Sequence, residues 1–438
     1  MISASLLLTL FLQIAVILAV CRLLGLLGTR VGQTQAVSDM VTGIVLGPSL
    51  LGLFAPSFQS WLFPQHATVA VGPATAAMTH PSMSILYALS QLGLVLYMFT
   101  VGLDFKTDLF RGRLRTVGLV SSVGIVVPFA LGAGAAVFLA GRPDFFAAGI
   151  SVWLSALFLG ASMSVTAFPM LARILDEKGI SSTRLGTLTL AAGSMDDVVA
   201  WCLLAVMLAS LHATPSIAVL AIAGGMVYAI LMVWIGRPAL RILSRWAERD
   251  GGVTPSTLLT ALVVMMASAG LTDFLGIHSV FGAFLAGTVM PRGRLATGLR
   301  QHIEPLTTTL LLPLFFVYSG LNTRIALVNT STLWMLTAVI ILLAVAGKGV
   351  ACAVAARVAG EGWREAATVG TLMNARGLVE LIMLNVGLQA GIIQPTLFTI
   401  MVLMAVTTTV MASPLFDYFS RQLTLSQPSG AVAATAAR

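Results

Sequence analysis

Apolar runs of about twenty residues, long enough to cross a bilayer, follow one another along most of this 438-residue chain. Hydrophobic residues make up 58% of the sequence and charged residues only 9%, too few to cover the surface of a soluble protein. The basic residues behind the net charge of +8 are spread thinly between apolar runs, so they form no phosphate-binding face. We therefore expect an integral membrane protein, which excludes a soluble enzyme or a nucleic-acid-binding protein.

Windows of this length predict thirteen spanning helices and an all-α polytopic fold. The expected spans are 3–27, 36–54, 83–103, 115–140, 144–176, 184–211, 215–236, 256–275, 277–290, 306–321, 333–359, 363–389 and 395–420. The connection 55–82 is the longest on the outer side, and residues 424–438 are expected to form a disordered cytoplasmic tail because they are small and polar.

The basic residues predict the orientation of the chain. Of the 24 Lys and Arg residues, 20 fall in alternate connections that share one side of the membrane. Such residues collect on the cytoplasmic side, so we expect the N-terminus outside and the C-terminus in the cytoplasm. Arg142 and Arg324 lie in the expected outer connections, and Lys348 and Arg376 lie within spans.

Two pairs of segments resemble one another across the halves of the chain. "FTVGLDFK" ends the third run and "VYSGLNTR" the tenth, while "GASMSVTAFPMLARIL" from Gly160 matches "GTLMNARGLVELIML" from Gly370. We expect a membrane domain over 1–423 with repeat one at about 3–211, a linker helix at 215–236 and repeat two at about 256–420. The halves enter from opposite sides, which is the inverted-repeat plan of secondary transporters.

Asp196 and Asp197 are adjacent near the middle of the sixth run, "TLTLAAGSMDDVVAWCLLAVMLASL". Inserting one Asp at the centre of a bilayer costs about 2.5 to 3.5 kcal/mol, so an intramembrane acid is a functional candidate. Burial and a neighbouring like charge both favour the protonated form of a carboxyl group. A carboxylate that holds either a proton or a cation can act as an exchange site; permanent pairing with a buried base is the structural alternative.

Lys348 stands between two glycines in the eleventh run, in a chain with 21 arginines and only three lysines. A buried Lys can lose its proton near neutral pH, whereas Arg effectively never does. We expect Lys348 to pair with Asp196 and to yield when a cation or proton arrives. Extension of its side chain to the membrane surface is the alternative.

The fifth run carries Ser164 and Thr166 just before Pro169, which removes a backbone donor and disrupts the helix behind it. Hydroxyl and carbonyl oxygens at such a break can bind a desolvated cation. Ser164 and Thr166 are therefore candidate supporting residues of an interrupted helix.

The twelfth run carries Asn374, Arg376 and Glu380 in "TLMNARGLVEL". Arg376 and Glu380 are four residues apart, so they can pair on one helix face. We expect them chiefly to compensate the charges of half-helix ends, with direct ion contact as the alternative.

Several other polar residues are expected to have structural roles. The threonines 407–409 in the last run are assigned to helix packing. Asp39, Asp104 and Asp417 are expected at solvated cytoplasmic helix ends.

Taken together, these motifs resemble the monovalent cation:proton antiporter superfamily, and its second branch most of all. That branch includes bacterial sodium/proton antiporters, potassium-efflux antiporters and plant cation/proton exchangers. The resemblance covers about residues 36–415 and is carried by "GIVLGPSLLG", "LGLVLYMFTVGLDFK", "SMSVTAFPMLARILDEKGI", "SMDDVVAW", "FGAFLAG" and "NARGLVELIMLNVGL".

The resemblance implies a role for each matching residue. Asp197 matches the ion- and proton-binding carboxylate, Asp196 the position before it, and Lys348 the lysine that pairs with the first Asp. Thr166 matches a broken crossover helix, and the Asp-Asp form looks like that of electrogenic sodium/proton exchangers. The resemblance further implies a homodimer in which a core domain moves against a dimerisation domain. The preference for Arg over Lys and the many Ala residues suggest a bacterium, so the expected location is its inner membrane.

The hypothesis is a secondary antiporter that exchanges Na⁺, or alternatively K⁺ or Li⁺, for protons by alternating access. The chain is not expected to be an enzyme, since no catalytic cluster, phosphate-binding loop, structural metal site or cofactor motif is evident in the sequence. A sodium-coupled organic anion transporter of similar fold is an alternative, and an ion channel is a further one that the titratable pair disfavours.

Overall fold

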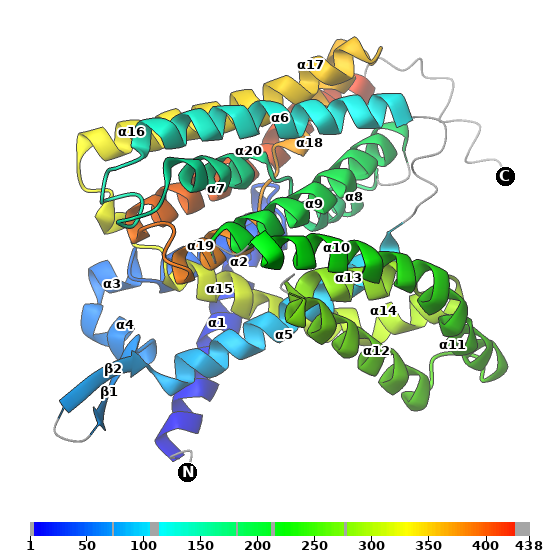
Figure 1. Cartoon of the computed structure of the whole chain (residues 1–438), viewed down its shortest axis with the longest axis horizontal. Coiled ribbons are helices and arrows are strands. Elements are labelled where there is room, and N and C mark those ends of the chain that lie inside the picture. Colours follow the sequence, from blue (N-terminus) through cyan, green and yellow to red (C-terminus); the bar gives the residue numbers. More distant parts are fainter. Residues whose placement is uncertain are drawn as a thin grey trace. The chain divides into compact units, whose positions relative to one another are not determined.

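The computed structural model describes residues 4–71, 74–105, 114–180, 183–211, 215–275 and 278–424. A helix or a pair of helices occupies each of the thirteen predicted spans, which confirms the polytopic helical fold (Figure 1). Within the described residues, nine helices are long and apolar enough to cross a membrane, and three more are apolar but shorter. The predicted tail lies outside the described residues from 425 onward.

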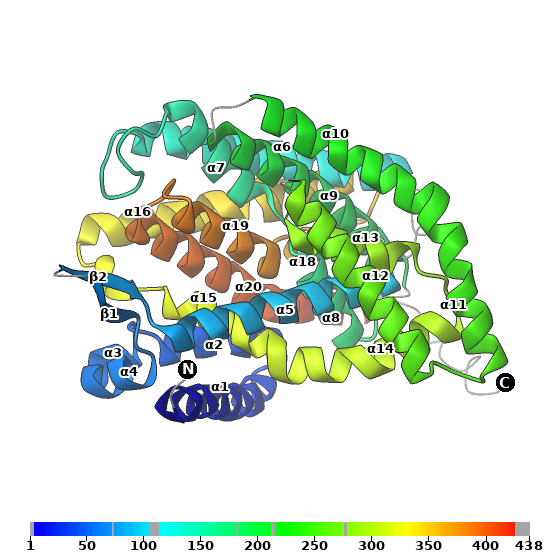
Figure 2. The same ribbon diagram turned by 60° about the horizontal axis from the view of Figure 1, so that its bottom comes forward.

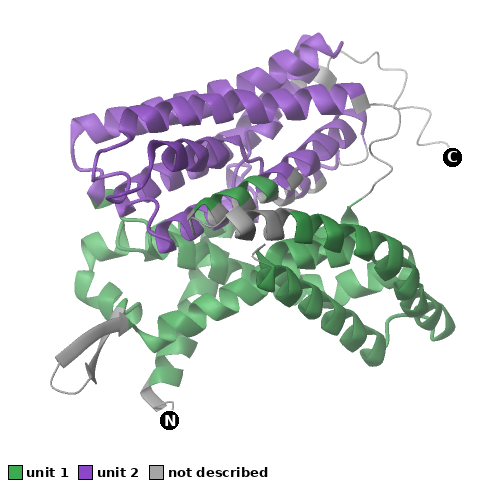
Figure 3. Cartoon of the chain, in the orientation of Figure 1, with its two compact units in different colours: residues 1–26, 38–107, 201–326 green, residues 27–37, 108–200, 327–438 purple. Residues whose placement is uncertain are grey.

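The chain divides into two compact units, each built from segments of both halves of the sequence (Figure 3). Unit 1 comprises residues 1–26, 38–107 and 201–326, and unit 2 comprises 27–37, 108–200 and 327–438. All the candidate site residues fall in unit 2.

Unit 1 contains the first three predicted spans and those from the seventh to the tenth. Its elements are α1 (Ala4–Arg30, to Leu26), α2 (Gln35–Leu46), α3 (Leu51–Phe54), α4 (Pro56–Leu62), β1 (His66–Val71), β2 (Ala74–Thr79), α5 (Pro81–Asp104), α10 (Pro215–Leu231), η2 (Met232–Gly236), α11 (Arg237–Arg249), α12 (Pro255–Phe274), α13 (Ser279–Val289), α14 (Arg294–Leu306), η3 (Thr307–Leu311), α15 (Leu312–Leu321) and η4 (Ile325–Leu327).

Unit 2 contains the remaining spans, two of which are interrupted. Its elements are α6 (Leu114–Leu139), α7 (Val152–Ser164), α8 (Phe168–Glu177), α9 (Arg184–Leu211, to Ala200), α16 (Ser331–Ala344), η5 (Val345–Val350), α17 (Ala351–Val358), α18 (Trp363–Met373), α19 (Leu378–Gln389) and α20 (Pro395–Thr424). The elements η2, η3 and η5 are π-helical turns inside longer helices, and η4 is a 3₁₀ turn.

The seventh and tenth helices are longer than the hydropathy pattern predicts. The seventh continues through η2 and α11 to Arg249, and the tenth begins at Arg294 (Figure 2). Both added segments are amphipathic, because α11 buries Leu240, Leu243 and Ala247 while its arginines stay exposed. The mean hydropathy of a window identifies the membrane-buried part of such a helix but not its amphipathic continuation.

The connection 55–82 also contains regular structure, namely α4 and the antiparallel hairpin of β1 and β2. His80 then caps α5, since its side chain accepts a hydrogen bond from the amide of Ser82, and Pro81 occupies the first helical turn. The described residues are thus helical apart from this hairpin and the connecting segments.

Unit 1 is held together partly by glycine contacts between helices. A Cβ atom on Gly43 of α2 would lie 2.7 Å from the carbonyl oxygen of Phe316 in α15, so only glycine permits this approach. Asp104 is about half exposed and pairs with Arg300, as expected for a solvated helix end. Asp39 is 1% exposed, so the expectation that it is solvated was wrong.

In unit 2, α6 packs along α7 and along α17, and α18 packs between α17 and α20 (Figures 1 and 2). Asp417 of α20 pairs with Lys178 at 2.7 Å, with both side chains partly exposed. This arrangement brings the two interrupted helices and α9 together, and it determines where the intramembrane charges lie.

Candidate functional site

The first of the two interrupted helices breaks where the sequence places a disrupting proline. The chain leaves helical geometry between Ser164 and Phe168, just before Pro169, whose missing N–H and ring prevent continuation of the preceding turn. The second break spans Asn374 to Gly377. The predicted interruptions are therefore present in both helices.

The two breaks contact one another inside unit 2. The backbone amide of Ala167 donates to the carbonyl oxygen of Ala375 at 3.3 Å, and the hydroxyl of Thr166 lies 3.5 Å from the carbonyl oxygen of Met373. Four half-helix ends thus meet in one small buried region, where their unpaired backbone groups present partial charges.

Asp196 is 1% exposed and accepts hydrogen bonds from three side chains. Ser121 of α6 donates to its Oδ1 at 2.6 Å, and Thr166 donates to its Oδ2 at 2.6 Å. Lys348 donates to the same Oδ2 at 2.7 Å. Three hydrogen-bond donors, one of them charged, stabilise the ionised form of this carboxylate.

Lys348 lies in the π-helical turn η5 and its side chain is fully buried. Its ammonium pairs with Asp196 and also donates to the backbone carbonyl oxygen of Ser164 at the end of α7. A cation at a helix C-terminus is stabilised by the negative end of the helix dipole. The alternative in which Lys348 extends to the membrane surface is excluded by this position.

Asp197 is 2% exposed, yet neither of its carboxylate oxygens has a hydrogen-bond partner among the described residues. The backbone amide of Phe168, at the start of α8, faces this carboxylate without the geometry of a hydrogen bond. A buried carboxylate is costly to hold as a bare anion, so it is stable when protonated or when it binds a cation. Two adjacent acids of equal burial therefore differ completely in their partners.

Arg376 and Glu380 form a second buried pair, with 3.5 Å between Nη1 and Oε1. Arg376 also donates to the carbonyl oxygens of Met163 at 2.7 Å and Ser162 at 3.3 Å. Arg376 therefore compensates the partial negative charge at the C-terminal end of α7. Glu380 lies in the first turn of α19, where the helix dipole favours a negative charge. These contacts agree with the expected dipole compensation.

The remaining candidates contribute mainly through their backbone or surround the site. The hydroxyl of Ser164 donates to Ala161 within its own helix at 2.8 Å, so its carbonyl is the part that contacts Lys348. Asn374 is 5% exposed, and its Oδ1 has no hydrogen-bond partner within the described part of the chain.

The roles of three residues in the site were not predicted from the sequence. Ser121 holds Asp196, and Gly124, one turn further along α6, leaves room for it. A Cβ atom on Gly124 would lie 2.6 Å from Sγ of Cys352 and 3.9 Å from both Asp196 Oδ2 and Lys348 Nζ. The polar, glycine-containing stretch "SSVG" in an otherwise apolar run is the signal that could have pointed to them.

Thr409, the third such residue, holds the second break rather than only packing helices. Its hydroxyl accepts from the backbone N–H of Arg376 at 3.0 Å and lies 2.7 Å from the carbonyl oxygen of Arg376. The hydroxyl has one proton, and the carbonyl oxygen of Ala405 also lies 2.7 Å away, so the contact that Thr409 supplies to the break is an acceptor for the Arg376 N–H.

The arrangement therefore leaves a single buried carboxylate at which a cation and a proton could compete. Asp196 and Lys348 neutralise one another beside it, and the half-helix ends are compensated by Arg376 and Glu380. Asp197 is left as the acid whose negative charge can be neutralised by a monovalent cation or by a proton.

Residues 15–418 match the family described as sodium/hydrogen exchanger, transmembrane. The Na⁺/H⁺ antiporter NhaS4 of Synechocystis sp. is 40% identical over 409 residues, which cover 92% of this chain and 95% of that protein. The K⁺/H⁺ antiporter 1 of Saccharomyces cerevisiae is 32% identical over 418 residues, which cover 93% of this chain but only 46% of that protein.

Among solved structures, the sodium proton antiporter MjNhaP1 from Methanocaldococcus jannaschii has a similar fold. The TM-score is 0.61 at 13% sequence identity, and the match covers 96% of this chain and 99% of that one. At this identity the likeness concerns the fold alone.

Proposed function

The chain belongs to the sodium/hydrogen exchanger family, and from this premise we propose that it is a secondary antiporter that exchanges a monovalent cation for protons at Asp197. The observation that carries the proposal is that Asp197 is buried without hydrogen-bond partners, beside an Asp196 that is fully satisfied. Competition between a cation and a proton for one carboxylate couples the two fluxes.

In this proposal one side of the site carries no net charge. Lys348 balances the charge of Asp196, and Thr166 donates a hydrogen bond to the same carboxylate. When a cation binds Asp197, its positive charge repels the nearby ammonium of Lys348 and favours loss of the lysine proton. Two protons would then move for each cation, which makes the exchange electrogenic. Ser164, Asn374, Arg376 and Glu380 support the broken helices that surround the site.

The transported cation is proposed to be Na⁺, with K⁺ as the second candidate. Similarity to both a Na⁺/H⁺ antiporter and a K⁺/H⁺ antiporter supports the two ions, and Li⁺ belongs in the same test because it is smaller. Transport of an organic anion finds no support in these relatives.

We also propose two inverted repeats, because each compact unit takes helices from both halves and each half contains one interrupted helix. The charge distribution supports an outer N-terminus and a cytoplasmic C-terminus. A homodimer is proposed from the family resemblance, and a bacterial inner membrane from the composition of the chain.

The test is proton flux in liposomes with an acid interior. Addition of Na⁺, K⁺ or Li⁺ outside should release internal protons, and the preferred ion should act at the lowest concentration. Asp197→Asn should lose this response, while Asp104→Asn, which changes an exposed ion pair in unit 1, should keep it. Cation-driven proton flux at the parental rate in Asp197→Asn would defeat the proposal.

A further inference from the structure

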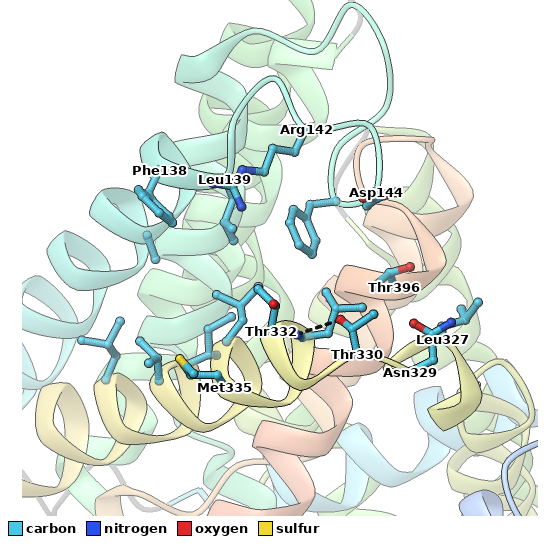
Figure 4. Close-up of a pocket in the computed structure, with 17 residues that line it drawn as sticks. Phe138, Leu139, Arg142, Asp144, Leu327, Asn329, Thr330, Thr332, Met335 and Thr396 are labelled. Atoms are coloured by element: carbon cyan, nitrogen blue, oxygen red, sulfur yellow. Dashed lines mark hydrogen bonds between the residues drawn. The ribbon is translucent and has the colours of Figure 1, made fainter.

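A groove in unit 2 lies outside the ion site and has no role in the exchange described above. It has a volume of about 850 Å³, within the range of small-molecule sites, and lies between the end of α6 and the first half of α16 (Figure 4). Further along, α6 closely approaches η5, the π-helical turn that continues α16, where a Cβ on Gly347 would lie 3.0 Å from Cα of Pro128. They separate beyond this contact, and the groove fills the gap.

The walls of the groove are apolar and belong to membrane-spanning helices. Phe138 of α6 is 69% exposed, and Met335 and Val339 of α16 are 68% and 44% exposed. Water is not the medium around such a surface at membrane depth, so an acyl chain is the natural partner of these walls.

One end of the groove carries two opposite charges that do not neutralise one another. Arg142 and Asp144 both line the mouth, and neither forms an ion pair with any residue that the structure describes (Figure 4). The guanidinium of Arg142 lies over the ring of Phe138, 4.9 Å from its centre. The hydroxyl of Thr330 caps α16 at the same mouth by accepting from Leu333.

The turn that carries these charges is fixed to unit 2. The carbonyl oxygen of Arg142 accepts from the amides of Phe145 and Phe146 at 3.1 and 3.3 Å. Phe145 in turn accepts from the amide of Gln394 at 2.9 Å, in the segment before α20. Arg142 and Asp144 are thus held at a defined place above the apolar walls.

We propose that this groove binds phosphatidylethanolamine, with an acyl chain along α6 and α16, its phosphate at Arg142 and its ammonium at Asp144. A guanidinium is the preferred partner of a phosphate, and a carboxylate accepts hydrogen bonds from a primary ammonium. A purely anionic headgroup would meet repulsion from Asp144, and a quaternary ammonium has no N–H to donate.

The test is native mass spectrometry of the detergent-solubilised protein titrated with dioleoyl lipids. Phosphatidylethanolamine should bind more tightly than phosphatidylcholine or phosphatidylglycerol. Arg142→Gln should weaken its binding by about tenfold or more, the effect of one lost charge-assisted hydrogen bond. Arg115→Gln, an exposed arginine at the other end of α6, should have no effect.

Two further variants locate the lipid. Val339→Trp should fill the groove and weaken binding, whereas Leu342→Trp, which is exposed on α16 outside the groove, should not. Asp144→Asn should remove the preference over phosphatidylglycerol. Equal affinities for the three lipids, or equal binding by Val339→Trp and Leu342→Trp, would overturn the proposal, and thermal unfolding checks that each variant is folded.

Discussion

Asp196 and Asp197 have different surroundings, although the residues are adjacent and almost equally buried. Asp196 accepts from Ser121, Thr166 and Lys348, whereas Asp197 has no hydrogen-bond partner among the described residues. Successive helix residues point about 100° apart, so one acid faces α6 and η5 and the other faces the start of α8. In the proposed mechanism the first acid stabilises the site and the second binds the transported ion.

The largest expected effect on transport comes from Asp197→Asn. The change should reduce cation-driven proton flux by at least about a hundredfold, because an amide neither holds a proton nor neutralises a cation. Thermal unfolding should be unchanged or shifted upward, since the change removes a buried charge without removing a partner. Flux loss accompanied by lower stability would contradict the division of roles between the two acids.

Removing Lys348 should have the largest effect on stability. Lys348→Ala leaves Asp196 buried without its counterion, which should cost about 3 to 5 kcal/mol of unfolding free energy. The double variant Asp196→Asn/Lys348→Gln removes both charges and should recover much of that loss. Denaturation in detergent would measure both, and a double variant no more stable than Lys348→Ala would contradict charge pairing as the cause.

The hydroxyl donors to Asp196 should have intermediate effects. Ser121→Ala and Thr166→Val each remove one hydrogen bond to a charged group, so each should cost about 1.5 to 3 kcal/mol. Both should leave measurable exchange, because Asp197 is unchanged. Ser122→Ala, which alters the neighbouring position in α6, is the matched control and should be near neutral in the same unfolding assay.

The smallest effect is expected at Thr409. Thr409→Val removes hydrogen bonds to the backbone of Arg376, far from either acid in sequence, and should cost about 1 kcal/mol. Thr407→Val in the same helix is the control. Thr409 is not a hydrogen-bond partner of the Asp196 carboxylate. The apparent cation affinity should therefore stay within about threefold of the parent. A larger shift would mean that this break contributes directly to ion binding.

Much of this site follows from the sequence because each of its charges is expensive in hydrocarbon. Asp196, Asp197 and Lys348 stand out for that reason, and Pro169 predicts where α7 must end. The span limits follow from hydropathy as long as a helix remains apolar, so the amphipathic α11 and α14 were missed.

The partners of the charges could not be predicted in the same way. Ser121 and Thr409 are ordinary small polar residues of membrane helices, and only the packing of α6 and α20 brings them to Asp196 and Arg376. The pairing of Lys348 with Asp196 was expected, whereas its second contact, with the backbone carbonyl oxygen of Ser164, was not, because that contact depends on where α7 ends beside η5.

Proton release from the purified protein tests the central claim most directly. Adding Na⁺ or K⁺ to the protein in weakly buffered detergent should release protons, and the cation concentration for half-maximal release should fall as the pH rises, because fewer protons compete. Asp197→Asn should release none, while Asp104→Asn should match the parent. Proton release of parental size from Asp197→Asn would contradict the account.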